Sequence, residues 1–242
     1  MKHQQLYSKI RQAIDDYHMI DDGDRIAVGL SGGKDSLALL YALHGLRRFY
    51  PIPFSIIAVT VDLGFEGQDY SELITLCRHL DVPYHIVPTQ IAQIVFQVRQ
   101  EEHPCSLCSK LRKGALNQKL LELHCNKLSY AHHRDDVIDT MMLSLVYEGR
   151  WNTMSPVTHL DRTDLTLIRP LIYVKEADIK GWVKTYHIPV QPSKCPADRS
   201  GKRKAVKELI QTIGREAPGV RDRMFTAIQK SGMEGWAKNE TE

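Results

Sequence analysis

The sequence lacks any long apolar segment, and its N-terminus lacks an apolar core. Its 242 residues contain no hydrophobic run that approaches the length of a membrane span, which is roughly eighteen residues or more. The opening residues, MKHQQ, have none of the apolar centre of a secretory signal peptide. These absences argue against a membrane protein, and we expect a cytoplasmic location.

Cysteine is scarce, and its count is odd. The chain has five cysteines, at positions 77, 105, 108, 125 and 195. An odd number without an export signal argues against a disulfide framework and leaves metal binding, redox chemistry or burial. Internal repeats are also absent. The length suits one large α/β domain, with or without an appendage.

Charge is nearly balanced over the whole chain but is unevenly distributed. The net charge is +3, yet residues 194–230 hold ten Lys or Arg and four Asp or Glu. That segment is therefore +6 and the remainder is −3. Such asymmetry favours a polyanionic partner. The alternative is an ordinary solvated helix face, which is the more common meaning of a basic run taken alone.

Apolar runs of strand length alternate with helix-like segments along most of the chain. The run FSIIAVTVD is almost wholly apolar, as expected of a parallel strand covered on both faces. The alternation predicts an α/β fold with a doubly wound, mostly parallel, Rossmann-like sheet and helical extensions at both ends. We predict strands at 25–30, 54–62, 84–87, 127–131 and 165–168. We predict helices at 4–19, 37–49, 69–80, 109–124, 137–148, 175–186, 202–213 and 218–230, a loop at 151–164, an irregular segment at 187–201 and a loose tail from Ser231.

A glycine-rich hexapeptide, SGGKDS at 31–36, separates the first predicted strand from the helix that follows it. The N-terminus of a helix offers unpaired N–H groups and the positive end of the helix dipole, which bind anions. Gly32 and Gly33 permit positive φ and close approach, and Lys34 adds a mobile positive charge. Neither the ATPase P-loop nor the dinucleotide fingerprint matches this spacing. The pattern predicts a phosphate cradle for a nucleotide rather than a merely glycine-rich turn.

A second polar sequence, HHRDD at 132–136, follows the predicted strand 127–131. We expect it beside the phosphate cradle, because neighbouring strands end at one edge of a parallel sheet. His132 and His133 can contact phosphate or act as acid–base groups near neutral pH, or else cap and pack at the strand end. Arg134 can bind phosphate or form an ion pair with a neighbouring aspartate.

Two further residues lie at predicted strand ends. Asp62 closes the strand 54–62, where it either approaches the adenosine or forms a turn before Gly64. Arg169 follows the strand 165–168 and either reaches the nucleotide or forms a surface ion pair.

Cys105 and Cys108 form a C-x-x-C pair where a loop meets a helix. Two thiolates at this spacing can share a metal ion or cluster, and a helix N-terminus lowers the thiol pKa. Three interpretations remain open from the residues. A zinc site would draw a further ligand from His103, Cys125 or Cys195, a dithiol redox pair needs no further ligand, and an iron–sulfur cluster would use Cys195 as its third cysteine.

Five motifs occur in one order: SGGKDS, HPCSLCSKLRKGAL, AHHRDD, IRPL and a late single cysteine. Together they resemble the tRNA 2-thiocytidine synthetase (TtcA) family of PP-loop ATP pyrophosphatases, from about residue 20 to 215. This chain departs from the pattern at Ala131, where the family usually has Gly, and at Pro192-Ser193-Lys194-Cys195, where the family commonly has Pro-Cys-x-x-Cys.

The resemblance implies a PP-loop fold like that of adenine nucleotide α-hydrolases, and ATP-dependent tRNA thiolation. The C2 oxygen of a cytidine in the anticodon loop is adenylated and then replaced by sulfur, with Mg²⁺ and an oxygen-sensitive [4Fe-4S] cluster. Catalytic roles are expected of Lys34, which can neutralise charge on the phosphates, and of Asp35 and Asp135, either of which can hold Mg²⁺. ATP contacts are expected from Ser31, Gly32, Gly33, Lys34, Asp35, Ser36, Asp62, His132, Arg134 and Arg169. The cluster ligands carried over are Cys105, Cys108 and Cys195, which leaves Cys77 and Cys125 as buried thiols.

The expected tRNA contacts are basic residues near the cysteines and in the C-terminal part of the chain. They are Arg112, Lys113, Arg199, Lys202, Arg203, Lys204 and Lys207. No aromatic-interleaved RNA recognition motif is visible. We divide the chain into an N-terminal helix (1–20), an ATP-binding domain with the inserted cysteine pair (21–186) and a C-terminal cysteine segment with basic helices (187–242). A cysteine desulfurase or free sulfide is the expected sulfur source, and a homodimer is expected by analogy.

Rival functions stay open within and outside this fold. Another PP-loop tRNA enzyme would make 2-thiouridine or join an amine to cytidine as lysidine synthetase does. A non-catalytic nucleotide- or zinc-binding module that associates with RNA is the rival from another class. The cysteine set counts against lysidine formation, and intact Lys34, Asp35 and Asp135 count against a non-catalytic module.

Overall fold

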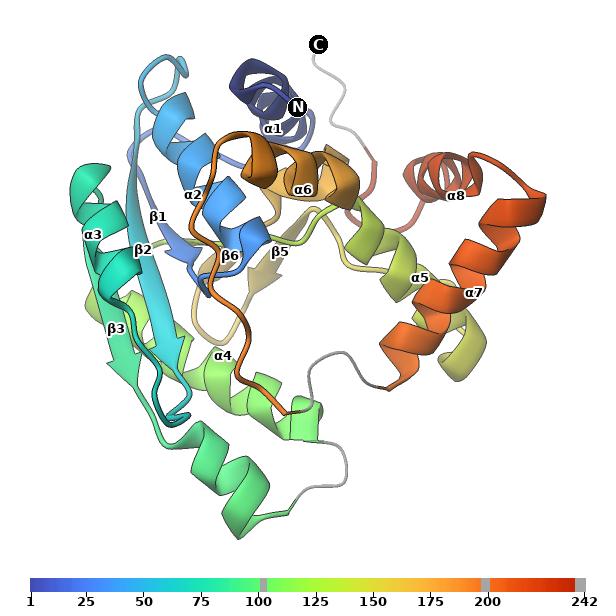
Figure 1. Cartoon of the computed structure of the whole chain (residues 1–242). Coiled ribbons are helices and arrows are strands. Elements are labelled where there is room, and N and C mark those ends of the chain that lie inside the picture. Colours follow the sequence, from blue (N-terminus) through green and yellow to red (C-terminus); the bar gives the residue numbers. More distant parts are fainter. Residues whose placement is uncertain (101–103, 197–200, 238–242) are drawn as a thin grey trace.

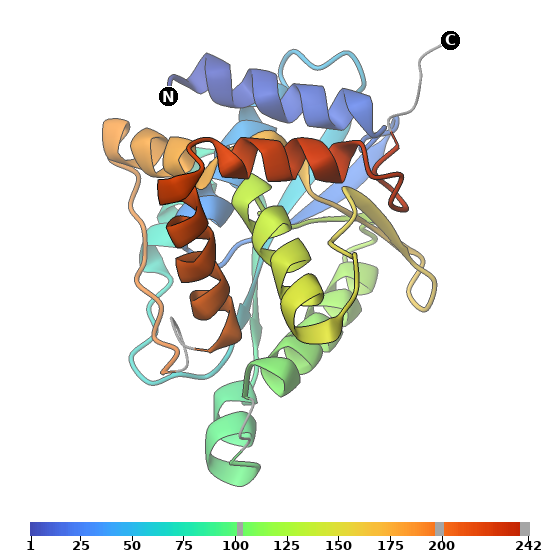
Figure 2. The same ribbon diagram turned by 90° about the vertical axis from the view of Figure 1, so that its right-hand side faces the viewer.

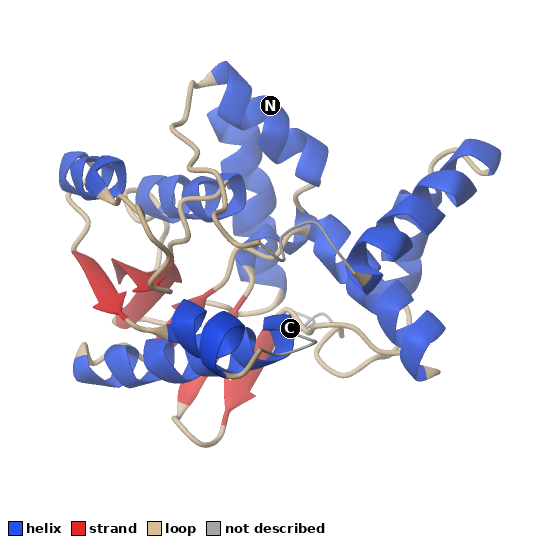
Figure 3. Ribbon diagram, turned by 60° about the horizontal axis from the view of Figure 1, so that its bottom comes forward, coloured by secondary structure: helices blue, strands red, loops and turns tan. Residues whose placement is uncertain are grey.

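A computed structural model of the protein describes residues 1–100, 104–196 and 201–237, and its six strands form one sheet between layers of helices (Figures 1 and 3). The strand order is β3-β2-β1-β4-β6-β5. The strands are β1 (Asp24–Gly29), β2 (Phe54–Asp62), β3 (Tyr84–Pro88), β4 (Lys127–Ser129), β5 (Val157–Leu160) and β6 (Leu165–Ile168). All neighbouring pairs are parallel except β5 with β6. The predicted doubly wound, mostly parallel sheet is confirmed.

The helices connect the strands and continue beyond the last of them. They are α1 (His3–Asp16), α2 (Lys34–Leu46), α3 (Ser71–His79), α4 (Pro104–Glu122), α5 (Arg134–Glu148), α6 (Glu176–Thr185), α7 (Lys202–Glu216) and α8 (Val220–Gln229). A π-helix at Gln93–Val98 and a 3₁₀-helix at Pro170–Tyr173 complete the described elements. No helix in the described ranges is long and apolar enough to cross a membrane.

The sheet buries apolar side chains on both faces, which accounts for the continuous apolar runs of its central strands. In β1, Ile26 and Val28 join the larger core, whereas Ala27 between them faces the smaller one. The larger core also takes residues from α1, α2, α5, α6, α7 and α8, and the smaller one is closed by Leu116 and Leu120 of α4. The terminal helices therefore share one core with the sheet (Figure 2).

The order of the strands creates a switch point beside β1. From β1 the chain proceeds outward to β2 and β3 on one side, then returns to β4 on the other. In the register, Val28 pairs with Ala58 of β2 and with Ser129 of β4. The segments after β1 and after β4 therefore leave the same sheet edge side by side, where open α/β sheets bind ligands.

Three predictions about local structure are wrong. The predicted loop 151–164 contains β5, which was missed because an edge strand with one exposed side has a short, mixed pattern. The helix predicted at 109–124 begins at Pro104, so the cysteine pair lies inside its first turns. The tail after Ser231 is not loose throughout, because Trp236 is 1% exposed and packs edge-on against Tyr17 and Phe225.

Candidate functional site

The loop between β1 and α2 is shaped by its own serine hydroxyls. The Ser36 hydroxyl donates to the Gly33 carbonyl oxygen at 2.9 Å and accepts from the Ser31 amide at 3.2 Å. The Ser31 hydroxyl lies 3.1 Å from that of Ser36 and accepts from the Gly33 amide at 3.3 Å. Gly32 has φ +77°, which favours glycine. The loop is thus held open at the N-terminus of α2, where the first-turn amides have no acceptor within the helix.

Lys34 lies between two carboxylates. Its Nζ is 2.7 Å from Asp35 Oδ2 and 3.1 Å from Glu176 Oε1 at the start of α6. Burial lowers the pKa of Lys34, but the two carboxylates offset this effect and raise it overall. Burial also opposes ionisation of Glu176, yet Lys34 and Lys180 hold its pKa at about 2. Sequence reasoning did not single out Glu176, since a first-turn acid usually only complements a helix dipole.

His133 begins α5 and faces the phosphate loop. Its Nδ1 accepts a hydrogen bond from the Asp136 amide at 3.3 Å, and Asp136 Oδ2 accepts from the His133 amide at 3.0 Å. Nε2 lies 3.8 Å from Asp35 Oδ1. The expected adjacency of the two loops at one sheet edge is therefore observed.

Arg169 is buried and His132 is half-buried, and the two side chains are near enough to interact electrostatically. Burial, assisted by Arg169, lowers the pKa of His132 to about 4, so its ring is neutral near pH 7. That pKa makes His132 a poor acid–base group near neutrality. Arg169 donates to the Ser155 carbonyl oxygen and to Thr158 Oγ1, the latter at 3.0 Å. It is neither a surface residue nor one half of a surface ion pair.

Asp135 uses both carboxylate oxygens to hold other helices. Oδ2 accepts from the Glu176 amide at 2.7 Å, and Oδ1 accepts from Arg221 of α8 at 3.1 Å. Arg221 also reaches Asp139 at 3.3 Å, one turn further along α5. Asp139 is fully buried, and burial raises its pKa despite the opposing effects of Arg221 and Lys207. Asp139 and Arg221 were not predicted, because the network forms only when the C-terminal helices fold back onto α5.

Two predicted ATP contacts have other partners in the structure. Arg134 pairs with Asp222 of α8, and its guanidinium lies 5.1 Å from the centre of the Phe225 ring. Asp62, at the end of β2, accepts from the Gly64 amide at 3.0 Å and from the Tyr70 hydroxyl at 3.1 Å. Asp62 thus lies at the predicted sheet edge and also forms the turn considered as its alternative.

The segment after α6 crosses the phosphate loop on its way to Cys195 (orange in Figure 1). Gln191 donates from its amide to the Gly32 carbonyl oxygen, and from its side chain to the Asp69 carbonyl oxygen, each at 3.0 Å. Lys194 donates to the Gly67 carbonyl oxygen in the loop after β2. We call residues 187–196 the strap. The strap was predicted as irregular, and its contact with the phosphate loop was not foreseen.

The three cysteines carried over from the family lie at one end of the molecule. Burial raises the pKa of the Cys108 thiol, Arg112 opposes this, and the thiolates of Cys195 and Cys105 raise it further. The three thiols therefore interact electrostatically. Within the described ranges, however, no group of three His, Cys, Asp or Glu side chains is close enough to hold a metal ion. His103, one candidate zinc ligand, lies outside the described residues.

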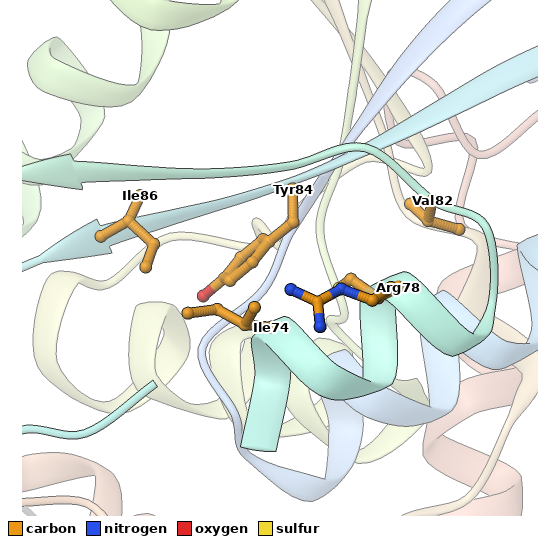
Figure 4. A pocket seen from close by; sticks show the side chains of 6 residues that line it. Ile74, Arg78, Val82, Tyr84 and Ile86 are labelled. Carbon is orange, nitrogen blue, oxygen red and sulfur yellow. The ribbon is translucent and has the colours of Figure 1, made fainter. Parts of the chain in front are cut away.

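The other two cysteines are core residues, as predicted. Cys77 is buried, and burial raises its pKa to about 11. It helps to line a shallow pocket between α3 and β3, which Figure 4 shows with Ile74, Tyr84 and Ile86 around it. Cys125 is buried after α4. The pocket contains none of the predicted site residues.

The predicted RNA-binding residues of α7 are partly engaged with α5. Arg203 lies 3.4 Å from Asp136 Oδ1, and Lys207 lies 3.7 Å from Asp139 Oδ2. Lys204 forms a loose pair with Glu208 at 3.8 Å. Arg112 and Lys113 lie on exposed or half-exposed surface of α4, beside the cysteine pair. Arg199 lies outside the described residues.

Comparison with known proteins gives consistent results. The PP-loop domain family matches residues 2–213. The chain is 40% identical over 225 residues to a tRNA-cytidine(32) 2-sulfurtransferase of Paraburkholderia phymatum, covering 92% of this chain and 67% of that protein. A protein of the same name from Geobacter sulfurreducens is 33% identical over 231 residues, covering 94% and 90%. The fold resembles the U34-tRNA thiolase NcsA of Methanococcus maripaludis, solved with its [4Fe-4S] cluster, at a TM-score of 0.74 and 23% identity over 96% of this chain and 80% of that one.

Proposed function

Because this chain belongs to the PP-loop domain family, together with the tRNA-cytidine(32) 2-sulfurtransferases, we propose that it is an ATP-dependent tRNA sulfurtransferase that converts a cytidine of the anticodon loop to 2-thiocytidine. One structural observation supports the proposal independently of sequence similarity. The strap joins the phosphate loop, through Gln191, to the end of the molecule where Cys105, Cys108 and Cys195 interact. A nucleotide site and a thiol site at opposite ends of one short segment suit a reaction that activates an oxygen and then replaces it with sulfur.

The first step is adenylation of the base. The C2 oxygen of cytidine attacks the α-phosphorus of ATP, a new O–P bond forms, and pyrophosphate leaves. Lys34 and the first-turn amides of α2 neutralise charge on the phosphates, and the loop serines fix the amides in place. Asp62 lies at the end of the adjacent strand, and we assign it to the adenosine side of the site.

Asp35 is the better of the two candidate Mg²⁺ ligands. Its Oδ1 is buried and accepts no hydrogen bond from any described residue, so it is an oxygen available to a hard cation. Asp135 already uses both oxygens, for the Glu176 amide and for Arg221. We assign Asp35 to Mg²⁺ and assign Asp135 to positioning α6, whose Glu176 pairs with Lys34.

The donor set that we propose for a [4Fe-4S] cluster is Cys105, Cys108 and Cys195, although in the described structure their side chains are not gathered closely enough to hold a metal ion. Cys105 and Cys108 lie in the first turns of α4, and Cys105 and Cys195 are near enough to Cys108 to raise the pKa of its thiol further. Bound by these three cysteines, a [4Fe-4S] cluster would supply an iron at which sulfide could be held. The protein's part is to hold the thiolates at the end of the strap and to bring the adenylated base to them. Sulfide then attacks C2 of the adenylated base, and the C2–O bond breaks as AMP leaves with the former base oxygen.

The tRNA is held by the exposed cations of α7 and α4. Lys202, Arg203, Lys204 and Lys207 follow one another along α7, and their affinity for phosphates is salt-dependent. We include Arg199 with them on its sequence position, and Arg112 and Lys113 beside the cysteines. The sulfur is expected from a cysteine desulfurase or free sulfide. The three-part division of the chain is kept as a division of roles, since all three parts share one core.

Anaerobically purified protein tests the function directly. With ATP, Mg²⁺, sulfide and a tRNA transcript that carries cytidine at position 32, wild type should release AMP and pyrophosphate and form 2-thiocytidine, detected by nucleoside mass spectrometry. Lys34→Ala should abolish the release of AMP and pyrophosphate and the formation of 2-thiocytidine, while the protein retains iron and acid-labile sulfide. Lysidine or 2-thiouridine as the product, or ATP turnover that persists in Lys34→Ala, would contradict the assignment.

A further inference from the structure

The C-terminal end of α5 exposes an unusual number of large apolar side chains. Tyr147 is 44% exposed, and Leu145 and Val146 before it in the last turns of α5 are also exposed, as is Trp151 just after the helix, at 51%. A folded chain normally buries such side chains or uses them in an interface. Nothing in the ATP or cysteine site engages them, so they call for a different explanation.

Two basic side chains lie beside these aromatics, one from a distant part of the chain and one next to Trp151 in sequence. The Nζ of Lys202, at the start of α7, lies 5.0 Å from the centre of the Tyr147 ring. Arg150, adjacent to Trp151, is exposed. We call Tyr147, Arg150, Trp151 and Lys202 the α5–α7 patch. The sequence did not reveal it, because its two segments are far apart along the chain.

The charge at the start of α7 is unfavourable for the helix alone. Lys202, Arg203 and Lys204 occupy its first turn, which contains no acidic residue. Cations there oppose the positive end of the helix dipole. Arg203 and Lys204 pair with Asp136 and Glu208, which offsets part of this conflict, and an anion bound beside Lys202 offsets more of it, which favours a negatively charged partner for the patch.

The patch lies at the same end of the molecule as the cysteines. In both Figure 1 and Figure 2, the C-terminal end of α5 and the N-terminal ends of α7 and α4 lie in the lower half of the view, above the helix of residues 93–98. Cys105 and Cys108 occupy the first turns of α4. A partner that presents a base to the cysteine end can therefore cover the patch as well.

We propose that the α5–α7 patch binds the single-stranded loop of the tRNA substrate, with unpaired bases stacked on Tyr147 and Trp151 and phosphates held by Arg150 and Lys202. Single-stranded nucleic acids are bound in this way, by aromatic faces within a basic groove. The inference rests on the proposed function and deepens it, because it separates recognition of the loop from the chemistry at Lys34 and the cysteines.

A second copy of this chain is a less suitable occupant. A two-fold interface places the same surface of each subunit against itself. Arg150, Lys202 and Lys204 of one copy would then lie close to those of the other, which like-charge repulsion opposes. The apolar residues alone favour self-association, and the surrounding cations favour RNA.

Trp151 provides a direct probe of this surface. The chain has three tryptophans, and Trp182 and Trp236 are buried at 0% and 1% exposure. Acrylamide should therefore quench mainly the emission of Trp151. Addition of an anticodon stem–loop RNA should protect Trp151 from quenching, whereas a duplex RNA with the same stem sequence should protect it much less.

Affinity measurements test the two aromatics separately. Tyr147→Ala and Trp151→Ala should each weaken binding of the stem–loop by about 5- to 150-fold, as loss of one stacked base predicts. Tyr147→Phe and Trp151→Phe should retain most of the affinity. The slope of affinity against salt should be unchanged in the aromatic variants and reduced in Lys202→Ala. Phe49→Ala, at a 54% exposed aromatic outside the patch, is the matched control.

The outcomes separate this proposal from the proposed function. Unchanged stem–loop affinity in both alanine variants, with native circular dichroism, would overturn the patch while leaving thiolation intact. A wild-type dimer that becomes monomeric in Tyr147→Ala and Trp151→Ala would also overturn it, in favour of self-association. Stem–loop binding that depends on the patch, in a wild-type protein that forms no 2-thiocytidine, would support the patch and overturn the proposed function.

Discussion

The backbone amide of Gln191 donates a hydrogen bond to the carbonyl oxygen of Gly32, at 3.0 Å. This bond fastens the strap to the phosphate loop, and the Gln191 side chain fixes it again at the Asp69 carbonyl oxygen. A few residues further on, the strap carries Cys195. Movement of the phosphate loop is thereby linked to the position of a proposed cluster ligand.

Gly32→Ala tests this link. The position has φ +77°, and an added Cβ would lie 2.8 Å from Gln191 Oε1 and 3.2 Å from Gln191 Cβ. The variant strains the loop and crowds the Gln191 side chain, so we expect ATP affinity to fall about 5- to 30-fold, because left-handed backbone costs a non-glycine residue about 1–2 kcal/mol. Isothermal titration with ATP measures the change.

The control is Gly114→Ala in α4, where an added Cβ meets nothing within 4 Å and should leave ATP affinity unchanged. A second change, Gln191→Ala, removes the side-chain amide whose oxygen the new methyl group meets and leaves the backbone amide in place. It should restore part of the ATP affinity of Gly32→Ala. No restoration would mean that the loss comes from loop strain alone and that the strap is not involved.

Glu176→Gln tests the ion pair that holds Lys34. The wild-type carboxylate lies 3.1 Å from Lys34 Nζ and also repels incoming phosphate. Its neutral analogue should lower KM for ATP a few-fold, because one negative charge is lost, and should lower kcat, because Lys34 is less firmly oriented. AMP formation across a range of ATP concentrations separates the two effects.

Asp178→Asn is the matched control for that change. Asp178 lies in the same first turn of α6 but pairs with Lys9 at 2.6 Å, away from Lys34. Its KM and kcat should equal those of wild type. A rise in both constants in Glu176→Gln would contradict a positioning role, as would an unchanged kcat.

The half-buried His132 predicts a loss of stability on mild acidification. The ordinary pKa of 6.5 applies to the unfolded chain, whereas burial holds the folded-state pKa at about 4. The unfolded state therefore binds more protons between these two values, and the free energy of unfolding falls as pH drops from about 6.5 to about 4, by at most about 1.4 kcal/mol per pH unit from this group. Urea unfolding at a series of pH values measures the slope.

His132→Asn should flatten the slope in that window. His159→Asn, at an exposed histidine on β5, should leave it as in wild type. The carboxylates of Glu176 and Asp222 begin to lose their contributions near their ordinary pKa values of 4.5 and 3.8 and lose the rest as pH falls toward about 2, so they affect mainly the acid end of this window and the range below it. An identical slope in His132→Asn and wild type between pH 6.5 and 4 would mean that another group is responsible.

The sequence was most informative where local pattern and tertiary role coincide. The strand at 54–62 was predicted with its observed bounds, because a central parallel strand is apolar on both faces. The adjacency of the phosphate loop and His133 followed from topology alone, and His133 does face Asp35. The family resemblance and the fold were likewise recognised from motif order.

What sequence reasoning missed depends on contacts between distant segments. Glu176 approaches Lys34 only because α6 begins beside α2, and Arg221 reaches Asp135 only because α8 folds back over α5. Neither residue has a distinctive neighbour in sequence. The edge strand β5 and the buried Trp236 were missed for the same reason, since their surroundings, rather than their own patterns, determine their structure.

Cys195→Ala tests the cluster assignment, which combines family resemblance with the electrostatic interaction of three thiols. The thiol is half-buried at the end of the strap, so its removal should cost little stability but should remove one of three protein ligands. Iron and acid-labile sulfide of anaerobically purified protein should fall well below those of wild type, with loss of the broad visible absorbance.

Cys125→Ala is the control for this change. Its thiol is buried after α4, so that variant should lose some stability and keep its iron. Full iron and sulfide in Cys195→Ala would assign the third ligand to another residue. One zinc and no sulfide in wild type would instead make the cysteines a structural metal site, and the adenylating loop would then stand without its sulfur chemistry.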